Sequence, residues 1–194
     1  SDNPSEFSED IKNAVATIHK RSTGLLSFVD SFRNLVRIPE AHFSKVSIHT
    51  LFNGLYQMIE TQIEKNRIDF QMSINEDEEI NVFSDETLLQ QALINLLNNA
   101  IDAVKEQADR QIRLTAVKNN SYTMISISDN GYGIESQNLE NIFIPFFTTK
   151  KSGNGIGLSI VKQIIFKIKA DIQVHSQPGK GCCFEVKLKN IPEL

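Results

Sequence analysis

The sequence predicts an α+β fold, a two-layer α/β sandwich in which a mixed, largely antiparallel sheet carries helices on one face. Helical and strand-like segments do not alternate regularly along the 194 residues, so a parallel α/β fold is not expected. Strand-like segments also come in adjacent pairs, such as the pair that flanks residues 119–121, as antiparallel neighbours do. Residues 85–107 contain no Gly or Pro and repeat apolar side chains at helical spacing.

The individual elements follow from the period of the apolar residues, which is two in strands and about 3.6 in helices. Strands are expected at residues 45–48, 68–74, 80–83, 112–118, 122–128, 171–176 and 183–188. Helices are expected at residues 51–65, 85–107 and 157–167. The acidic run at residues 75–79 is expected to form a solvated hairpin turn.

A long helix is expected to precede this domain, so that residues 1–40 and 41–194 form two parts of the chain. Apolar residues recur there at alternating four- and three-residue steps, a heptad seam interrupted only by Ser22, at Ile11, Val15, Ile18, Leu25, Val29, Phe32 and Val36. The next proline is Pro39. Such a seam needs partner helices, and the alternative is an amphipathic helix that packs on its own domain.

The helix at residues 85–107 is expected to carry a polar strip beside its buried stripe. The strip consists of Asn95, Asn99 and Asp102, which are four and three residues apart and therefore point the same way. The buried stripe consists of Leu89, Leu93, Leu96, Ala100 and either Ala103 or Val104. A magnesium ion suits such a strip, because it takes one or two protein oxygen ligands when phosphates and water supply the rest.

A second polar feature stands at the end of an alternating strand, at Asp129, and is followed by Gly131 and Gly133 in a turn. A carboxylate can accept a hydrogen bond from the exocyclic amine of adenine, whereas guanine presents an oxygen at that place. Asp129 is therefore a candidate for selecting the base, and the glycines let the backbone approach the ring. Taken alone, this pattern also fits an ordinary turn.

A third feature is the polar loop at residues 148–154, which leads through Gly155 and Gly157 into the helix at residues 157–167. The N-terminus of a helix presents unpaired backbone N–H groups and the positive end of its dipole, and both favour phosphate. Lys150 and Lys151 add positive charge in the loop. The pattern is neither a dinucleotide fingerprint nor a Gly-x-x-x-x-Gly-Lys-Ser/Thr element.

In this order, residues 95–100, 129–133, 143–147 and 153–158 resemble the N box, first glycine box, F box and second glycine box of the GHKL superfamily. The resemblance covers roughly residues 43–188 and is strongest to sensor histidine kinases, because Pro145 stands inside the F box. The ATPases of the superfamily use a Glu as general base four residues before the magnesium ligand. Here that position is Asn95, which cannot take a proton at neutral pH.

The resemblance implies the GHKL (Bergerat) ATP-binding fold and transfer of the ATP γ-phosphoryl to a histidine, for relay to an aspartate of a response regulator. ATP and Mg²⁺ are the implied cofactors, with Asn99 as the metal ligand and Asn95, Asn99 and Lys150 in catalysis. The residues implied to bind the nucleotide are Asn95, Asn99, Asp102, Asp129, Gly131, Gly133, Ile134, Phe147, Thr148, Thr149, Lys150, Lys151, Gly153, Asn154, Gly155, Ile156, Gly157 and Leu158.

The same resemblance implies the partners and the missing parts of the protein. The stretch through residues 21–39 is similar to the second helix of the dimerisation and phosphoacceptor hairpin in kinases related to the nitrogen-regulation sensors. The acceptor motif is absent, since His19 is followed by Lys20 and Arg21 rather than an acidic residue. The chain also begins without Met, so we expect a fragment of a kinase that is a homodimer at full length.

Composition argues against nucleic-acid binding and against a membrane span within this fragment. A formal charge of −4 gives no basic footprint for nucleic acid, and no apolar run is long enough for a membrane span, so any such span lies upstream of this fragment. Cys182 and Cys183 are strand neighbours that face opposite ways, so free thiols and a cytoplasmic location are expected. Relatives often carry hydroxyl residues there, which leaves a phosphate contact at this place open.

Two alternatives to a histidine kinase remain. One is a GHKL-fold kinase, either a serine kinase of the anti-sigma-factor type or a protein kinase of the mitochondrial type, and the heptad seam and the F box argue against the first of these. The other is a degenerate nucleotide-binding module that signals by conformation alone. No motif residue is visibly lost, which counts against this second alternative.

Overall fold

The computed structural model describes residues 12, 14, 15, 17–19, 22, 38–74, 79–150 and 153–190. The chain divides into two compact units, Ser1–Arg37 and Ile38–Leu194. In the first unit, every described residue is helical, and the described seam residues Val15 and Ile18 are exposed. Ile11, Leu25, Val29, Phe32 and Val36 lie outside the described residues. The assignment of this unit to a dimerisation hairpin stays a prediction.

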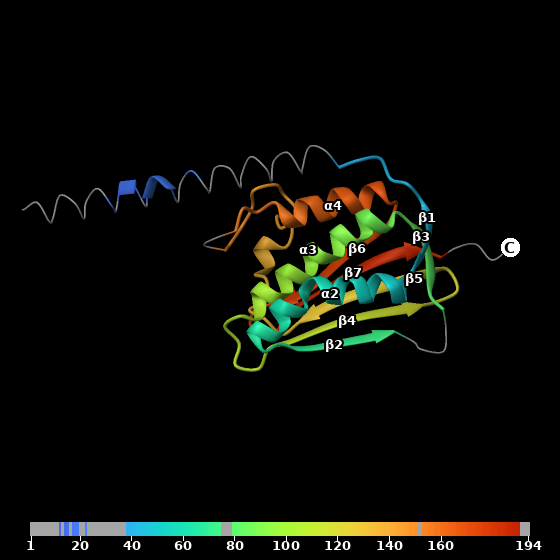
Figure 1. The fold of residues 1–194 in the computed structure, drawn as a ribbon, viewed down its shortest axis with the longest axis horizontal. Coiled ribbons are helices and arrows are strands. Elements are labelled where there is room, and N and C mark those ends of the chain that lie inside the picture. The colour runs from blue at the N-terminus through green and yellow to red at the C-terminus, as the bar shows by residue number, and fades with distance from the viewer. Residues whose placement is uncertain are drawn as a thin grey trace, which may run out of the picture. The chain divides into compact units, whose positions relative to one another are not determined.

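The second unit is built on a five-stranded mixed sheet (Figure 1). Its strands, in spatial order, are β2 (Asp69–Ile74), β4 (Gln111–Lys118), β5 (Tyr122–Asp129), β7 (Gly181–Lys189) and β6 (Asp171–Gln177). β2 and β4 are parallel, and the other three pairs are antiparallel. The predicted mixed, largely antiparallel sheet is therefore confirmed, including the β4–β5 hairpin around residues 119–121.

Two short strands form a separate antiparallel ribbon, β1 (Ser44–Ser47) with β3 (Asn81–Ser84). A single bridge between Val82 and Asn190 connects this ribbon to the chain just beyond β7. The expected hairpin at residues 75–79 is wrong, because the strands on either side of it, β2 and β3, belong to different sheets. Residues 75–78 themselves lie outside the described residues.

Three helices lie in one layer over a single face of the five-stranded sheet, with α3 between α2 and α4 (Figure 1). They are α2 (Ile48–Asn66), α3 (Glu86–Val104) and α4 (Gly157–Lys167). A short 3-10 helix, η1 (Ser136–Asn138), lies between β5 and α4 in the chain. Within the described residues, each helix is too short or too polar to cross a lipid bilayer.

The core lies between this helical layer and the sheet. The predicted stripe of α3 is buried, with Val104 rather than the half-buried Ala103 as its last member. The inward-facing residues of the central strands, such as Ile125 and Ile127 of β5, are buried from the sheet side. Because α3 crosses the middle of the sheet, its polar strip is held on a rigid element.

Capping residues set where two of the helices begin. Ser47 caps α2 by accepting from the Thr50 N–H at 3.4 Å, so this helix begins at Ile48, three residues before the expected start. Asp85 caps α3 by accepting from the Leu88 N–H at 2.9 Å. The same carboxylate accepts from the His42 N–H at 2.7 Å, which ties the chain before β1 to α3.

Candidate functional site

The polar strip of α3 begins opposite the N-terminus of α4. Asn95 is half-buried, and its side-chain amide donates to the Gln91 carbonyl at 2.8 Å. A Cβ placed on Gly157 would lie 3.4 Å from the Asn95 Oδ1, so the first residue of α4 packs directly against this side chain. The structure therefore brings the first and the fourth of the predicted motif segments together.

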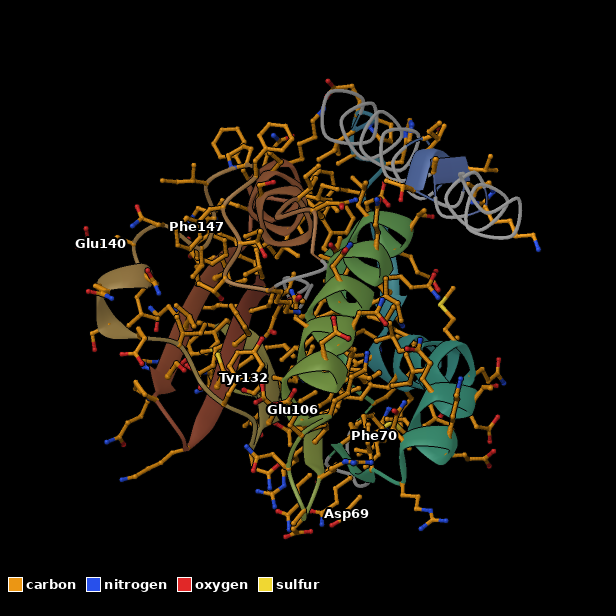
Figure 2. All side chains as sticks on the ribbon, turned by 90° about the vertical axis from the view of Figure 1, so that its left-hand side faces the viewer. Asp69, Phe70, Glu106, Tyr132, Glu140 and Phe147 are labelled. Carbon is orange, nitrogen blue, oxygen red and sulfur yellow. The ribbon has the colours of Figure 1, made fainter. Side chains whose placement is uncertain are left out.

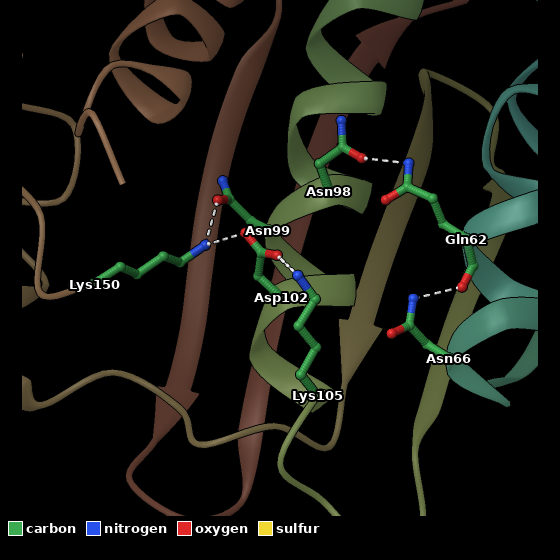
Figure 3. Close-up of polar contacts among 7 residues, drawn as sticks. All are labelled: Gln62, Asn66, Asn98, Asn99, Asp102, Lys105 and Lys150. Atoms are coloured by element: carbon green, nitrogen blue, oxygen red, sulfur yellow. Dashed lines mark hydrogen bonds and ion pairs between the residues drawn. The ribbon is translucent and has the colours of Figure 1, made fainter. Parts of the chain in front are cut away.

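One turn further along α3, the strip meets the loop that precedes α4 (Figure 3). The Lys150 Nζ donates to the Asn99 Oδ1 and to the Asp102 Oδ2, each at 3.1 Å. The Lys105 Nζ donates to the other carboxylate oxygen of Asp102 at 2.6 Å. Partial burial favours a higher pKa for Asp102, but the hydrogen bonds and charges of the two lysines outweigh it and lower the pKa. Lys151 lies outside the described residues.

At the far end of the strip, the turn after β5 packs against α3. A Cβ on Gly131 would lie 2.6 Å from both the Cβ and the carbonyl oxygen of Ala103. Gly133 has a φ of +70°, and a Cβ there would lie 2.2 Å from the Gln177 carbonyl oxygen. The glycines are thus required by close approach to α3 and to the end of β6, a cause that the sequence alone did not reveal.

Asp129 is held at the end of β5, directly before this turn. Its Oδ1 accepts from the Gly131 N–H at 2.8 Å. Burial raises the pKa of Asp129 to about 6, and the backbone N–H groups of Gly131 and of Cys182, its partner in the sheet register, together with the charge of Lys150 offset only part of that rise. The carboxylate is therefore fixed in place and carries unused acceptor capacity.

The F box and the second glycine box are joined by the backbone. The Phe146 N–H donates to the Gly155 carbonyl at 2.8 Å, and both residues have positive φ, +69° and +64°. A Cβ on Gly155 would lie 2.5 Å from the Phe146 carbonyl carbon, so only glycine fits there. This contact closes the base of the loop at residues 147–154, which carries Lys150.

The N-terminus of α4 is capped by Ile156, whose side chain cannot accept a hydrogen bond. The backbone N–H groups of the first turn are therefore not satisfied by a cap side chain, as in helix ends that bind anions. Ile156 is only 3% exposed, so it can face a ligand only through its backbone. The half-buried Gly157 and Leu158 open the helix beside Asn95.

The other predicted residues lie in the loop at residues 147–154. The Thr148 Oγ1 accepts from the Lys150 N–H at 3.1 Å and shapes the loop locally. Phe147 is half-buried, whereas Thr149, Gly153 and Asn154 are exposed on the loop surface. Figure 2 looks onto this end of the domain, where Phe147 and Tyr132 are labelled.

Sequence reasoning missed Ser176, which joins the turn after β5 to the end of β6. The Ile134 N–H donates to the Ser176 Oγ at 2.8 Å, and this hydroxyl donates to the Gly181 carbonyl at 2.9 Å. No local signal marks Ser176, because its partner Ile134 is 42 residues away. The two cysteines are free, as expected, with Cys182 buried and Cys183 partly exposed.

The fit of a metal ion to this site can be tested on the oxygen atoms of α3. Among the described residues, no group of three or more His, Cys, Asp or Glu side chains could hold a metal by itself. The Asn99 Oδ1 and the Asp102 Oδ2 nevertheless converge on one cationic nitrogen, 3.1 Å from each. These two hard oxygens suit magnesium, provided that phosphates and water complete its shell.

Comparison with known proteins agrees with this geometry. Residues 84–191 match the family described as histidine kinase-, DNA gyrase B-, and HSP90-like ATPase. The chain is 34% identical over 177 residues to the signal transduction histidine-protein kinase AtoS of Escherichia coli (strain K12), and 33% identical over 169 residues to the sensor histidine kinase ZraS of the same strain. Each alignment covers 87% of this chain but only 29% and 36% of the relative, so the chain spans about a third of their length.

Solved structures give the same result. The nucleotide-free catalytic domain of the histidine kinase ThkA matches with a TM-score of 0.69 and 32% identity, over 77% of this chain and 96% of that one. A longer form of ThkA, in complex with the response regulator protein TrrA, matches with a TM-score of 0.75 and 26% identity. That match covers 98% of this chain and 53% of the ThkA chain.

Proposed function

The chain belongs to the histidine kinase-, DNA gyrase B- and HSP90-like ATPase family, and on that premise we propose that it is the ATP-binding catalytic domain of a sensor histidine kinase. It transfers the γ-phosphoryl of ATP to a histidine on the dimerisation hairpin of the full-length protein, for relay to an aspartate of a response regulator. The relatives AtoS and ZraS, both named histidine kinases, support this proposal.

One observation carries the proposal: two motif segments and the loop lysine Lys150 meet α3 at successive positions along a single helix face. The second glycine box meets it at Asn95, the loop lysine meets it at Asn99, and the first glycine box meets it at Ala103. The nucleotide accordingly lies along α3, with its base near Asp129 and its phosphates near Gly157.

At the base end, Asp129 accepts a hydrogen bond from the exocyclic amine of adenine. Its carboxylate already accepts from the Gly131 N–H, which fixes its orientation. Guanine presents an oxygen where adenine has this amine and would meet the negative charge instead, so the site prefers ATP to GTP.

At the phosphate end, the N-terminus of α4 and the loop cation Lys150 hold the triphosphate, with Lys151 beside it in the sequence. Asn99 holds the magnesium ion, and Asn95 orients the neighbouring phosphate. When bound, magnesium would neutralise negative charge on the phosphates, as is usual in phosphoryl transfer.

The chain's own residues perform positioning rather than proton abstraction. Asn95 stands where the ATPases of the family carry a basic Glu, so no side chain at this place activates water. A bound γ-phosphoryl is thereby kept for an incoming imidazole, and catalysis rests on alignment and electrostatics.

The partners follow from the same proposal. They are the phosphoacceptor helix, a second copy of the full-length kinase, and a response regulator, the last supported by the complex of ThkA with TrrA. Neither nucleic acid nor a membrane surface is a partner of this part of the chain, and its location is the cytoplasm.

A transfer assay tests the proposal. The chain is incubated with γ-labelled ATP, magnesium and a hairpin fragment of the parent protein that carries the acceptor histidine. We expect acid-labile, alkali-stable label on the hairpin and none on the chain alone, where His19 is the histidine of the first helix. Acid-stable label would favour a serine or protein kinase on this fold. Tight ATP binding without transfer would favour a degenerate signalling module.

A further inference from the structure

The contact between Lys150 and α3 has a geometry beyond that of a simple ion pair. Its ammonium nitrogen lies 3.1 Å from the Asn99 Oδ1 and 3.1 Å from the Asp102 Oδ2, so an amide oxygen and a carboxylate oxygen share one cation (Figure 3). The two acceptors are three residues apart on α3, whereas Lys150 comes from a loop 48 residues after Asp102. The side chain of Lys150 is 29% exposed, so the position is partly shielded from water.

Lys105 fixes the orientation of the carboxylate in this arrangement. Its ammonium donates to the Oδ1 of Asp102 at 2.6 Å, whereas Lys150 contacts the Oδ2. Each carboxylate oxygen therefore has its own cation, and the Oδ2 is turned toward the Asn99 Oδ1 on the same helix face. An amide oxygen and a carboxylate oxygen held together are hard ligands of the kind that magnesium takes from proteins.

We propose that the Asn99 Oδ1 and the Asp102 Oδ2 form a single cation position, which the ammonium of Lys150 fills in the nucleotide-free chain and yields to the metal of a metal–nucleotide complex. Asp102 is then a second oxygen ligand beside Asn99, and Lys150 is its internal competitor. This inference rests on the proposed nucleotide-binding function and specifies which residues set its metal dependence.

The lysine ammonium carries one positive charge, whereas the metal carries two. A partly exposed ion pair of a flexible lysine is weak, so a dication brought by a triphosphate can replace it. The loop that carries the released ammonium stays closed at its base, where the Phe146 N–H donates to the Gly155 carbonyl. It is then free to face the phosphates, so one lysine serves the empty and the filled site in turn.

Calorimetric titration with a non-hydrolysable ATP analogue, with and without magnesium, tests the inference. The dissociation constant without magnesium divided by the dissociation constant with magnesium measures the coupling between metal and nucleotide. Asp102→Ala should lower this ratio about tenfold or more, because even outer-sphere partners of a metal change its affinity by about 10- to 100-fold. Asp102→Asn keeps an oxygen ligand and should recover part of the loss.

Lys150→Met should change the coupling in the opposite direction. Removing the competing ammonium should raise the ratio by about two- to fivefold, the factor that corresponds to a partly exposed ion pair. Glu106→Gln is the control for charge alone, since it removes one negative charge near the end of α3. This control should leave the ratio within about twofold of the unsubstituted chain.

The outcomes separate this inference from the proposed function. If the unsubstituted chain binds the analogue with magnesium coupling but Asp102→Ala keeps that coupling, Asp102 only anchors the loop and the inference is overturned while the function stands. If the unsubstituted chain does not bind the analogue at all, both are overturned. Manganese bound to each variant with the analogue, counted by electron paramagnetic resonance, gives an independent readout of the ligand loss, and circular dichroism confirms that each variant is folded.

Discussion

At the scale of a single residue, burial raises the pKa of Asp129 and so affects how this carboxylate can bind a nucleotide. It accepts from the Gly131 N–H at 2.8 Å, yet burial keeps its pKa near 6, well above that of an exposed Asp. A carboxylate in this state ionises only slightly below neutral pH. Its role in binding therefore depends on both charge and position.

Replacing Asp129 with Asn should impair ATP binding more than any other single change in the pocket. The amide loses the charge, and its NH₂ group can face the amine of adenine, so about 1–3 kcal/mol of binding free energy should be lost. Calorimetry on the folded variant measures this loss. Unchanged ATP affinity would remove Asp129 from the adenine-binding role.

The raised pKa predicts the pH dependence of binding. Because the carboxylate is protonated below about pH 6 in the nucleotide-free chain, ADP affinity should fall as the pH is lowered through this value, by up to about tenfold per pH unit. The Asp129→Asn chain should lack this part of the slope and retain only the part due to the phosphates of ADP. Identical pH profiles of the two chains would show that Asp129 does not titrate in the binding reaction.

The placement of site side chains could be predicted where local helical spacing decides it. Asn95, Asn99 and Asp102 share one face because helical spacing alone fixes it. The contact of Lys150 with that face and the bond between Ile134 and Ser176 could not be predicted, since each joins segments more than forty residues apart. Such contacts depend on tertiary packing, which no local pattern encodes.

At the scale of elements, the turn after β5 packs so closely against its neighbours that its glycines leave no room for a side chain. A Cβ on Gly133 would lie 2.2 Å from the Gln177 carbonyl oxygen, whereas a Cβ on Gly179 would have nothing within 4 Å. Both glycines have positive φ, +70° and +75°. The pair thus separates a steric clash from backbone strain alone.

Gly133→Ala should therefore destabilise the domain considerably more than Gly179→Ala. The second change adds only left-handed strain, about 1–2 kcal/mol, while the first also forces the turn away from β6 and should weaken ATP binding. Thermal unfolding and nucleotide titration of the two variants measure both effects. Equal destabilisation by the two substitutions would contradict the packing described for this turn.

Several predicted element boundaries were accurate because apolar periodicity alone places them. α4 has the predicted limits, and the central strands differ by one or two residues. α2 begins earlier than predicted because Ser47, within the strand expected at residues 45–48, acts as its cap. The hairpin expected between β2 and β3 failed because strand pairing is long-range, and β2 instead pairs with β4 in parallel.

At the scale of the whole molecule, the family could be predicted because four motif segments occur in a fixed order. The family match at residues 84–191 and the relatives AtoS and ZraS confirm the predicted resemblance to sensor histidine kinases. In the structure, α3 is the common surface on which the two glycine boxes and the loop lysine converge. The roles of the individual site residues and of the first helix remain predictions.

The chain should hydrolyse ATP very slowly even when it is saturated with nucleotide and magnesium. Asn95 cannot serve as a base for water, and its amide instead donates to the Gln91 carbonyl within α3. Phosphate release measured under saturation should stay far below the rate of transfer to the acceptor hairpin. Release as fast as transfer would show that another group activates water.

We expect these segments to form one magnesium-dependent adenine nucleotide site, and a comparative titration of the chain tests this expectation most directly. ATP and GTP are each titrated by calorimetry, with magnesium and with a chelator. We expect one site per chain, tighter binding of ATP with magnesium than without it, and much weaker binding of GTP because of Asp129. Equal affinity for the two nucleotides, or ATP binding that is indifferent to magnesium, would contradict it.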